Sequence, residues 1–182
     1  FKENKKFIYG SLKHGARAKD FEIAIQWLVD AGLVYKVPLC KEVKLPLKVY
    51  EDPSAFKLFT LDLGLLGAMV GTEAKQVLIK NDIFSEYKGG MTEQYVLEEM
   101  KSNGEENIFY HKSDDGTRLE IDFMIQRDGK LLPIEVKAEG NVRANSLSNL
   151  LKQTPELHAF RYSMKPYIEQ EQMTCYPLYA IQ

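Results

Sequence analysis

Two carboxylates and a lysine stand on two consecutive strand-like runs, with Asp122 in the first run and Glu135 and Lys137 in the second. The segment Arg127-Asp128-Gly129-Lys130 separates the runs, and its Asp-Gly pair favours the positive φ angles of a two-residue type I′ turn. If Arg127 pairs with Lys130, Asp122 lies directly opposite Glu135. Opposed carboxylates repel each other unless a positive charge lies between them. A divalent cation such as Mg²⁺ or Mn²⁺ would suit this position.

The same register predicts how the two faces of the hairpin differ. Side chains alternate across a strand, so Asp122, Glu135 and Lys137 share a polar face. Glu120 falls opposite Lys137, which leaves an ordinary surface ion pair as an alternative role for that lysine. The other face is predicted to be apolar and to carry Leu119, Ile121, Phe123, Ile125, Leu132, Ile134, Val136 and Ala138.

A helix before the hairpin carries a further acid, Glu93. The helix is predicted from Thr92 to about Ser102, after a break at Gly89-Gly90 and before a stop at Asn103-Gly104. Glu93 shares its face with Val96, Leu97 and Met100, because residues three, four and seven positions apart lie on one side of a helix. This face can bring Glu93 towards the hairpin. The alternative is a first-turn acid that the helix dipole favours.

The remaining elements complete an α/β pattern. A short strand is predicted over 107–111, a helix over 145–154 that Pro155 ends, a strand over 158–162 and a last strand over 176–181. From Glu93 onward the order is therefore helix, three strands, helix and two strands.

This order, with Asp122 followed by Glu135-Val136-Lys137, resembles the PD-(D/E)XK nuclease superfamily. The proline that usually precedes the aspartate in that pattern is absent here. The resemblance implies a restriction-endonuclease-like core in which Asp122 and Glu135, helped by Glu93, hold Mg²⁺ or Mn²⁺. It also implies that Lys137 orients or activates the attacking water and offsets the charge of the scissile phosphate.

The first third of the chain predicts a winged-helix-like module. A helix over 19–31 with Asp20 as its N-cap is followed by Gly32, a strand over 33–37 and a lysine-rich stretch over 41–48 that reaches Val49-Tyr50 as a second strand. Such a module would contact DNA phosphates through Lys36, Lys41, Lys44 and Lys48. Its alternative role is a structural or protein-docking wing.

Next come a strand over 57–61, a short helix that Asp62 caps, and a stretch over 72–88 that reads as a helix or a loop. Arg143 and Lys152, near the helix predicted over 145–154, could also meet a phosphate backbone, and are equally well explained as solvated charges. We therefore divide the chain into a winged-helix-like module (1–56), a connector (57–88) and a nuclease-like domain (89–182).

A second resemblance spans nearly the whole chain. Several stretches are similar to the C-terminal region of prokaryotic AAA+-type ATPases: Gly15–Asp20, Ala31–Val34, Lys44–Lys48, Lys57–Phe59, Asp62–Leu66, Glu93–Val96, Glu120–Phe123, Ile134–Lys137 and Ser146-Leu147. The resemblance implies an N-terminal P-loop ATPase domain in the same polypeptide. This chain has no Gly-x-x-x-x-Gly-Lys-Ser/Thr stretch, so any ATP would bind to that other domain.

Composition limits the classes of function. A net charge of −2 and a pI near 6.0 exclude a protein that coats DNA through bulk charge. Two cysteines, Cys40 and Cys175, indicate a reducing compartment, and the absence of a signal-peptide pattern or long apolar run predicts a cytoplasmic location without a membrane span. We expect a metal-dependent nuclease-like domain acting on DNA. The alternatives are a non-catalytic nucleic-acid-binding domain and a protein-interaction or oligomerisation domain that serves the ATPase.

Overall fold

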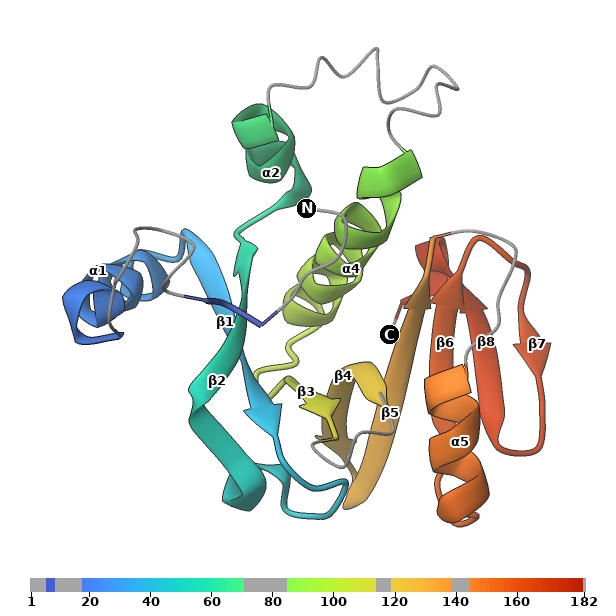
Figure 1. The fold of residues 1–182 in the computed structure, drawn as a ribbon. Coiled ribbons are helices and arrows are strands. Elements are labelled where there is room, and N and C mark those ends of the chain that lie inside the picture. Colours follow the sequence, from blue (N-terminus) through green and yellow to red (C-terminus); the bar gives the residue numbers. More distant parts are fainter. Residues whose placement is uncertain (1–5, 9–17, 71–84, 114–118, 139–144, 182) are drawn as a thin grey trace.

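A computed structural model describes residues 6–8, 18–70, 85–113, 119–138 and 145–181. Eight strands form one sheet in the order β2-β1-β3-β4-β5-β6-β8-β7 (Figure 1). Their bounds are β1 Val34–Cys40, β2 Glu51–Thr60, β3 Phe109–Lys112, β4 Glu120–Arg127, β5 Lys130–Lys137, β6 Ala159–Ser163, β7 Ile168–Glu169 and β8 Met173–Pro177. The predicted mixed α/β class is confirmed.

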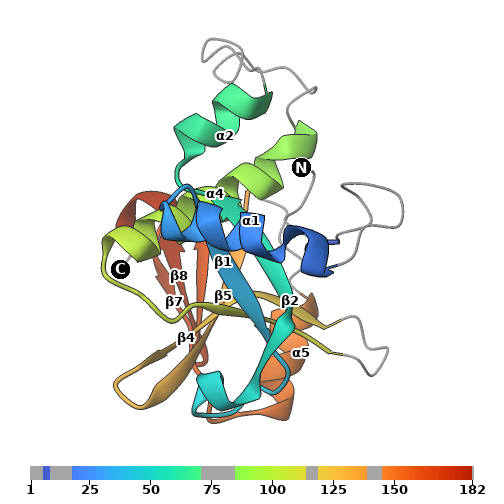
Figure 2. The same ribbon diagram turned by 90° about the vertical axis from the view of Figure 1, so that its left-hand side faces the viewer.

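The helices that accompany the sheet are α1 Ala18–Asp30, α2 Leu63–Val70, α4 Ser85–Ser102 and α5 Asn145–Gln153, with 3₁₀ turns η2 Leu47–Tyr50 and η4 Leu178–Ala180. The pairs β5–β6 and β6–β8 are parallel, and α5 supplies the crossover from β5 to β6. Figure 2 shows α1 beside β1 and β2, and Figure 1 shows α5 towards the other end of the sheet, over β6. Within the described residues no helix is both long and apolar enough to cross a membrane.

The β4–β5 hairpin has the predicted turn and register. Asp128 and Gly129 have φ angles of 51° and 71°, as a type I′ turn requires. The paired residues run from Arg127 and Lys130 at the turn to Phe123 and Ile134. The local chemistry of the turn thus fixes which residues of the two strands face each other.

A bulge in β4 breaks the alternation that the sequence predicted. Along β3, Phe109 pairs with Met124 but His111 pairs with Ile121, so Asp122 and Phe123 together oppose one residue. An extra residue of this kind bends a strand and re-aims its side chains.

As a result, Ile121 and Phe123 pack in different cores. Placing Leu119 and Ile121 on one face with Phe123 and Ile125 was therefore wrong. The bulge reverses the faces because it adds one residue to the strand.

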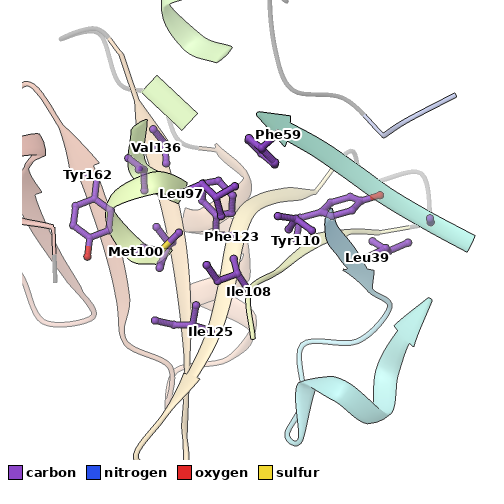
Figure 3. Close-up of a cluster of buried hydrophobic side chains, with 14 residues drawn as sticks. Leu39, Phe59, Leu97, Met100, Ile108, Tyr110, Phe123, Ile125, Val136 and Tyr162 are labelled. Atoms are coloured by element: carbon purple, nitrogen blue, oxygen red, sulfur yellow. The ribbon is translucent and has the colours of Figure 1, made fainter. Parts of the chain in front are cut away.

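Two apolar clusters cover the two faces of the sheet. The first joins Leu97 and Met100 of α4 to Phe123, Ile125 and Val136 of the hairpin, as Figure 3 shows. The second is built around α5 and contains Cys40, Leu47, Phe109, Leu119, Ile121, Met124, Leu131, Leu147, Leu150, Leu151 and Ala159. The helices α4 and α5 therefore pack on opposite faces of the same strands.

The helix α4 is longer than predicted. It begins at Ser85 and runs through Gly89-Gly90, so the expected break at these glycines was wrong. Gly90 is buried, which indicates that packing offsets the helix cost of the two glycines. The predicted stop is confirmed, because Gly104 has a φ of 91° and the Glu105 amide donates to the Met100 carbonyl.

The first third of the chain departs from a simple wing. The helix α1 begins two residues before Asp20, which therefore is not its N-cap. It ends as predicted, with Gly32 at a φ of 69°.

The predicted second strand over 41–50 was wrong. These residues form a loop and the 3₁₀ turn η2, and β2 starts only at Glu51. Moreover β1 pairs with both β2 and β3, so these strands extend the sheet that contains the hairpin.

The C-terminal strands also differ in detail from the prediction. The strand expected over 176–181 lies earlier, as β8, and residues 178–180 form η4. The short edge strand β7 had no clear signal in the sequence. Of the stretch over 72–88, residues 71–84 lie outside the described residues, so only its end, in α4, can be compared.

Candidate functional site

Asp122 lies in the β4 bulge, where β4 and β5 stop pairing. Its Oδ2 accepts a hydrogen bond of 2.7 Å from the backbone N–H of Val136. The Asp122 side chain thus accepts a hydrogen bond from β5 in place of a main-chain carbonyl, just beyond Phe123 and Ile134, the last pair of the hairpin. Because the bonded amide follows Glu135 directly, this contact fixes the Asp122 carboxylate next to the Glu-x-Lys segment.

The surroundings of Asp122 favour its protonated form. Burial and the nearby charge of Glu135 raise its pKa to about 6, although Lys57, the Val136 amide and Lys137 act in the opposite direction. A carboxyl with this pKa is ionised at neutral pH, at a cost in stability. Such a cost at a site between two strands is typical of a functional position.

Glu135 and Lys137 lie two residues apart on β5, and the Lys137 ammonium contacts the Glu135 carboxylate. Burial alone would lower the pKa of Lys137, but the charge and hydrogen bond of Glu135 outweigh it, so the pKa is raised. Lys137 is therefore a cation at neutral pH. Glu135 is 4% exposed, and its Oε2 has no hydrogen-bond partner among the residues that the structure describes.

Lys57 is a site residue that the sequence analysis missed. It lies on β2 and is only 1% exposed. Its Nζ lies 3.2 Å from Glu120 Oε1 and 3.9 Å from Glu93 Oε2. A signal was present, because strand alternation puts Lys57 on the face of the buried residues Ala55 and Phe59.

Glu93 and Glu120 therefore face Lys57. Glu93 is 9% exposed and lies on the buried side of α4 as predicted, with Val96, Leu97 and Met100. Glu120 pairs with Lys112 in the β3–β4 ladder, and its Oε2 lies 3.0 Å from Lys112 Nζ. Burial raises the pKa of Glu120, but Lys57 and Lys112 lower this pKa by a larger amount. The net shift of the Glu120 pKa is therefore downward. In the described part of the chain the salt bridges of Glu120 are with lysines 57 and 112, not with Lys137.

Arg161 adds a second cation beside the Glu-x-Lys segment. It lies on β6, where it pairs in register with Glu135. Its charge acts on Lys137, and its buried Nε has no hydrogen-bond partner within the described residues. Lys137 and Arg161 together place two positive charges next to the two carboxylates.

The residues predicted to contact nucleic acid are spread over the fold. The Lys36 ammonium lies 4.4 Å from the centre of the Phe56 ring. Lys41 pairs with Asp52 at 3.2 Å and Lys44 with Glu42 at 2.6 Å. Lys152 is exposed in the last turn of α5, and Arg143 lies outside the described residues.

The donor set limits how a metal ion could be held. In the described residues no group of three or more His, Cys, Asp or Glu side chains is arranged to hold one. Mg²⁺, however, often uses one or two carboxylates and completes its octahedron with water or substrate oxygens. Asp122 and Glu135 fit that requirement, because they are adjacent and Glu135 Oε2 has no protein hydrogen-bond donor in the described residues. Glu93, by contrast, faces an ammonium group.

Comparison with known families gives two matches. Residues 1–76 match a family described as a domain of unknown function (DUF8612). Residues 88–180, which hold most of α4, the hairpin, α5 and the last strands, match a family described as a domain of unknown function (DUF4143). No curated protein and no solved structure matches the chain. Because the second match covers half of the sequence and includes Asp122, Glu135 and Lys137, the chain belongs to the DUF4143 domain family.

Proposed function

We propose that the protein is a divalent-metal-dependent nuclease, with a restriction-endonuclease-like core that hydrolyses phosphodiester bonds in DNA. The observation that carries the proposal is the hydrogen bond from the Val136 amide to Asp122. This bond joins the bulged aspartate to the segment that holds Glu135 and Lys137. The order α4-β3-β4-β5-α5-β6, with β5 and β6 parallel, also supports the nuclease core that the sequence resemblance implies.

Each residue has a distinct role in this proposal. Asp122 and Glu135 would hold Mg²⁺ or Mn²⁺, which supplies Lewis acidity at the phosphate. Lys137 is a hydrogen-bond donor to the scissile phosphate and not a base, because its raised pKa keeps it protonated. Arg161 lies next to Glu135 on the neighbouring strand and would bind an adjacent phosphate oxygen.

The proposal for the wider assembly rests on the sequence alone. We propose that this domain works beside a P-loop ATPase domain in the same polypeptide, which would bind ATP. The support is the resemblance of its segments to the C-terminal region of prokaryotic AAA+-type ATPases. Lys36, Lys41 and Lys44 in the first third of the chain would then contribute weak DNA contacts through phosphates.

Cleavage of defined substrates tests the proposal. Supercoiled plasmid, linear duplex and single-stranded RNA are incubated with the purified chain and Mg²⁺ or Mn²⁺. We expect cleavage of DNA that EDTA stops and that Asp122→Asn, Glu135→Gln and Lys137→Met abolish. Lys130→Met is the matched control, because Lys130 is an exposed lysine at the turn of the same hairpin.

Three outcomes are decisive. Cleavage that survives in the Asp122→Asn and Lys137→Met variants would come from a contaminant and would refute the proposal, as would absence of any cleavage. DNA binding that weakens with salt and is unchanged in the same variants would instead support the non-catalytic nucleic-acid-binding role.

A further inference from the structure

Lys57 is buried as a charged ammonium group, and partners must offset the free-energy cost of this burial. Its side chain is 1% exposed and lies among Ala55 and Phe59 of β2 on the face covered by α4. Moving an ammonium from water into such a place costs several kcal/mol unless partners offset the cost. The partners of Lys57 therefore define a cation site that the fold builds from residues far apart in the sequence.

Two acids lie beside this ammonium. Glu120 Oε1 of β4 lies at 3.2 Å and Glu93 Oε2 of α4 at 3.9 Å. Asp122 lies two residues beyond Glu120, and the Lys57 charge acts against the rise in the pKa of Asp122. Carboxylates from a helix and a strand thus converge on one positive charge, as they would around a metal ion.

An aromatic ring completes the surroundings. The Lys57 Nζ lies 5.1 Å from the centre of the ring of Tyr110, a buried residue of β3. A ring face at this distance attracts a cation without forming a coordinate bond, and the attraction strengthens when water is excluded. The ring suits an ammonium better than Mg²⁺, which requires oxygen ligands.

We propose that Lys57 is a built-in cation that occupies the Glu93–Glu120 side of the site, so that the protein holds one divalent ion, at Asp122 and Glu135, and not two. The inference rests on the proposed metal-dependent function and adds the number of ions and the role of Glu93. In two-metal sites the ions lie about 3.5–4 Å apart and share acidic ligands. Here the covalently attached ammonium supplies the positive charge that a second ion would bring, so Glu93 orients Lys57 and does not ligate the metal.

Counting bound Mn²⁺ tests this role without measuring catalysis. The full chain is titrated with Mn²⁺, and free Mn²⁺ is followed by electron paramagnetic resonance. We expect one ion per chain for the wild type and one additional ion for Lys57→Met, because the variant leaves Glu93 and Glu120 without their ammonium. Lys112→Met is the matched control, since Lys112 also contacts Glu120, at 3.0 Å, but is solvent-exposed. This control should keep the wild-type count.

The result that overturns the inference is an unchanged count in folded Lys57→Met. If the wild type itself binds no Mn²⁺, the proposed metal-dependent function fails. The role of Lys57 is still decided by a different comparison, which is whether Lys57→Met binds one more ion than the wild type. The two failures are therefore distinguishable.

A second variant decides the question if Lys57→Met does not fold. Glu93→Gln should weaken the affinity for the wild-type ion by less than about 100-fold, which is the largest loss typical of removing a group outside the ligand set. A larger loss would identify Glu93 as a ligand and overturn the inference.

Discussion

Asp122→Asn should make the protein more stable at neutral pH while removing the proposed nuclease activity. The pKa of Asp122 is raised from the usual 3.8 to about 6 by burial and by Glu135. At about 1.4 kcal/mol for each unit of pKa, this difference corresponds to roughly 3 kcal/mol. Because Asp122 is partly exposed, solvent screening reduces the expected gain to about 1–2 kcal/mol. Asparagine can still accept the Val136 hydrogen bond through its Oδ1.

The gain should depend on pH in a defined direction. Between pH 4 and 6 the native Asp122 binds a proton that the unfolded chain has already lost. The free energy of unfolding of the wild type therefore carries a component that falls as pH rises through this window. The variant lacks this component. Urea unfolding with EDTA at several pH values should show equal stabilities near pH 4 and the full difference above pH 6.

Asp52→Asn is a control variant in which the change in stability should have the opposite sign. Hydrogen bonds from the side chain and backbone of Ser54 hold the pKa of Asp52 down, at about 2. Its ionised form therefore stabilises the fold above pH 4, and this contribution is lost as pH falls towards 2. The Asn variant at this position should be less stable than the wild type at neutral pH.

The outcome that would refute the reasoning on Asp122 is an Asn variant that is less stable than the wild type at pH 7, or a difference that does not change with pH. Added Mn²⁺ gives an independent reading, because an ion that binds only the native state raises stability with its concentration. We expect this increase in the wild type and not in Asp122→Asn.

Further predictions concern the reaction and the framework. At Mg²⁺ concentrations that do not saturate the site, the rate of DNA cleavage should rise with pH through about 6, as Asp122 loses its proton and becomes able to bind the ion; a rate that is flat between pH 5 and 8 under these conditions would contradict its role. Asp62→Ala should lower the free energy of unfolding by about 0.5–2 kcal/mol, because Asp62 Oδ1 accepts a hydrogen bond of 2.6 Å from the Leu65 amide and caps α2. In urea denaturation Asp62→Asn should retain most of the stability. Equal losses of stability in both variants would exclude capping. Gly129→Ala should cost about 1–2 kcal/mol, because the residue has a φ of 71°, and a thermal unfolding midpoint equal to that of the wild type would contradict the turn assignment.

Short-range chemistry explains what could be predicted. The hairpin register follows from Asp128-Gly129, since both residues accept positive φ. The ends of α1 and α4 follow from Gly32 and Gly104, and the start of α2 follows from Asp62. Each signal acts within a few residues, so it can be recognised without knowing the fold.

Long-range pairing explains what could not be predicted. The bulge at Asp122 exists only because β3 pairs with both sides of it. The passage of α4 through Gly89-Gly90 depends on the burial of that helix against the sheet. Propensity alone favours a break at these glycines, and tertiary packing overrides it.

The sequence by itself determined that Asp122, Glu135 and Lys137 belong to one hairpin, because a two-residue turn sets the register of the strands that it joins. Only the tertiary structure decided which charges meet there. It brings Lys57 from β2 to Glu93 of α4 and Glu120 of β4, and it orients Asp122 towards the Val136 amide. The physical reason is that burial makes the contacts of a charged side chain energetically decisive, whereas the same lysine in an exposed strand would be an ordinary solvated residue.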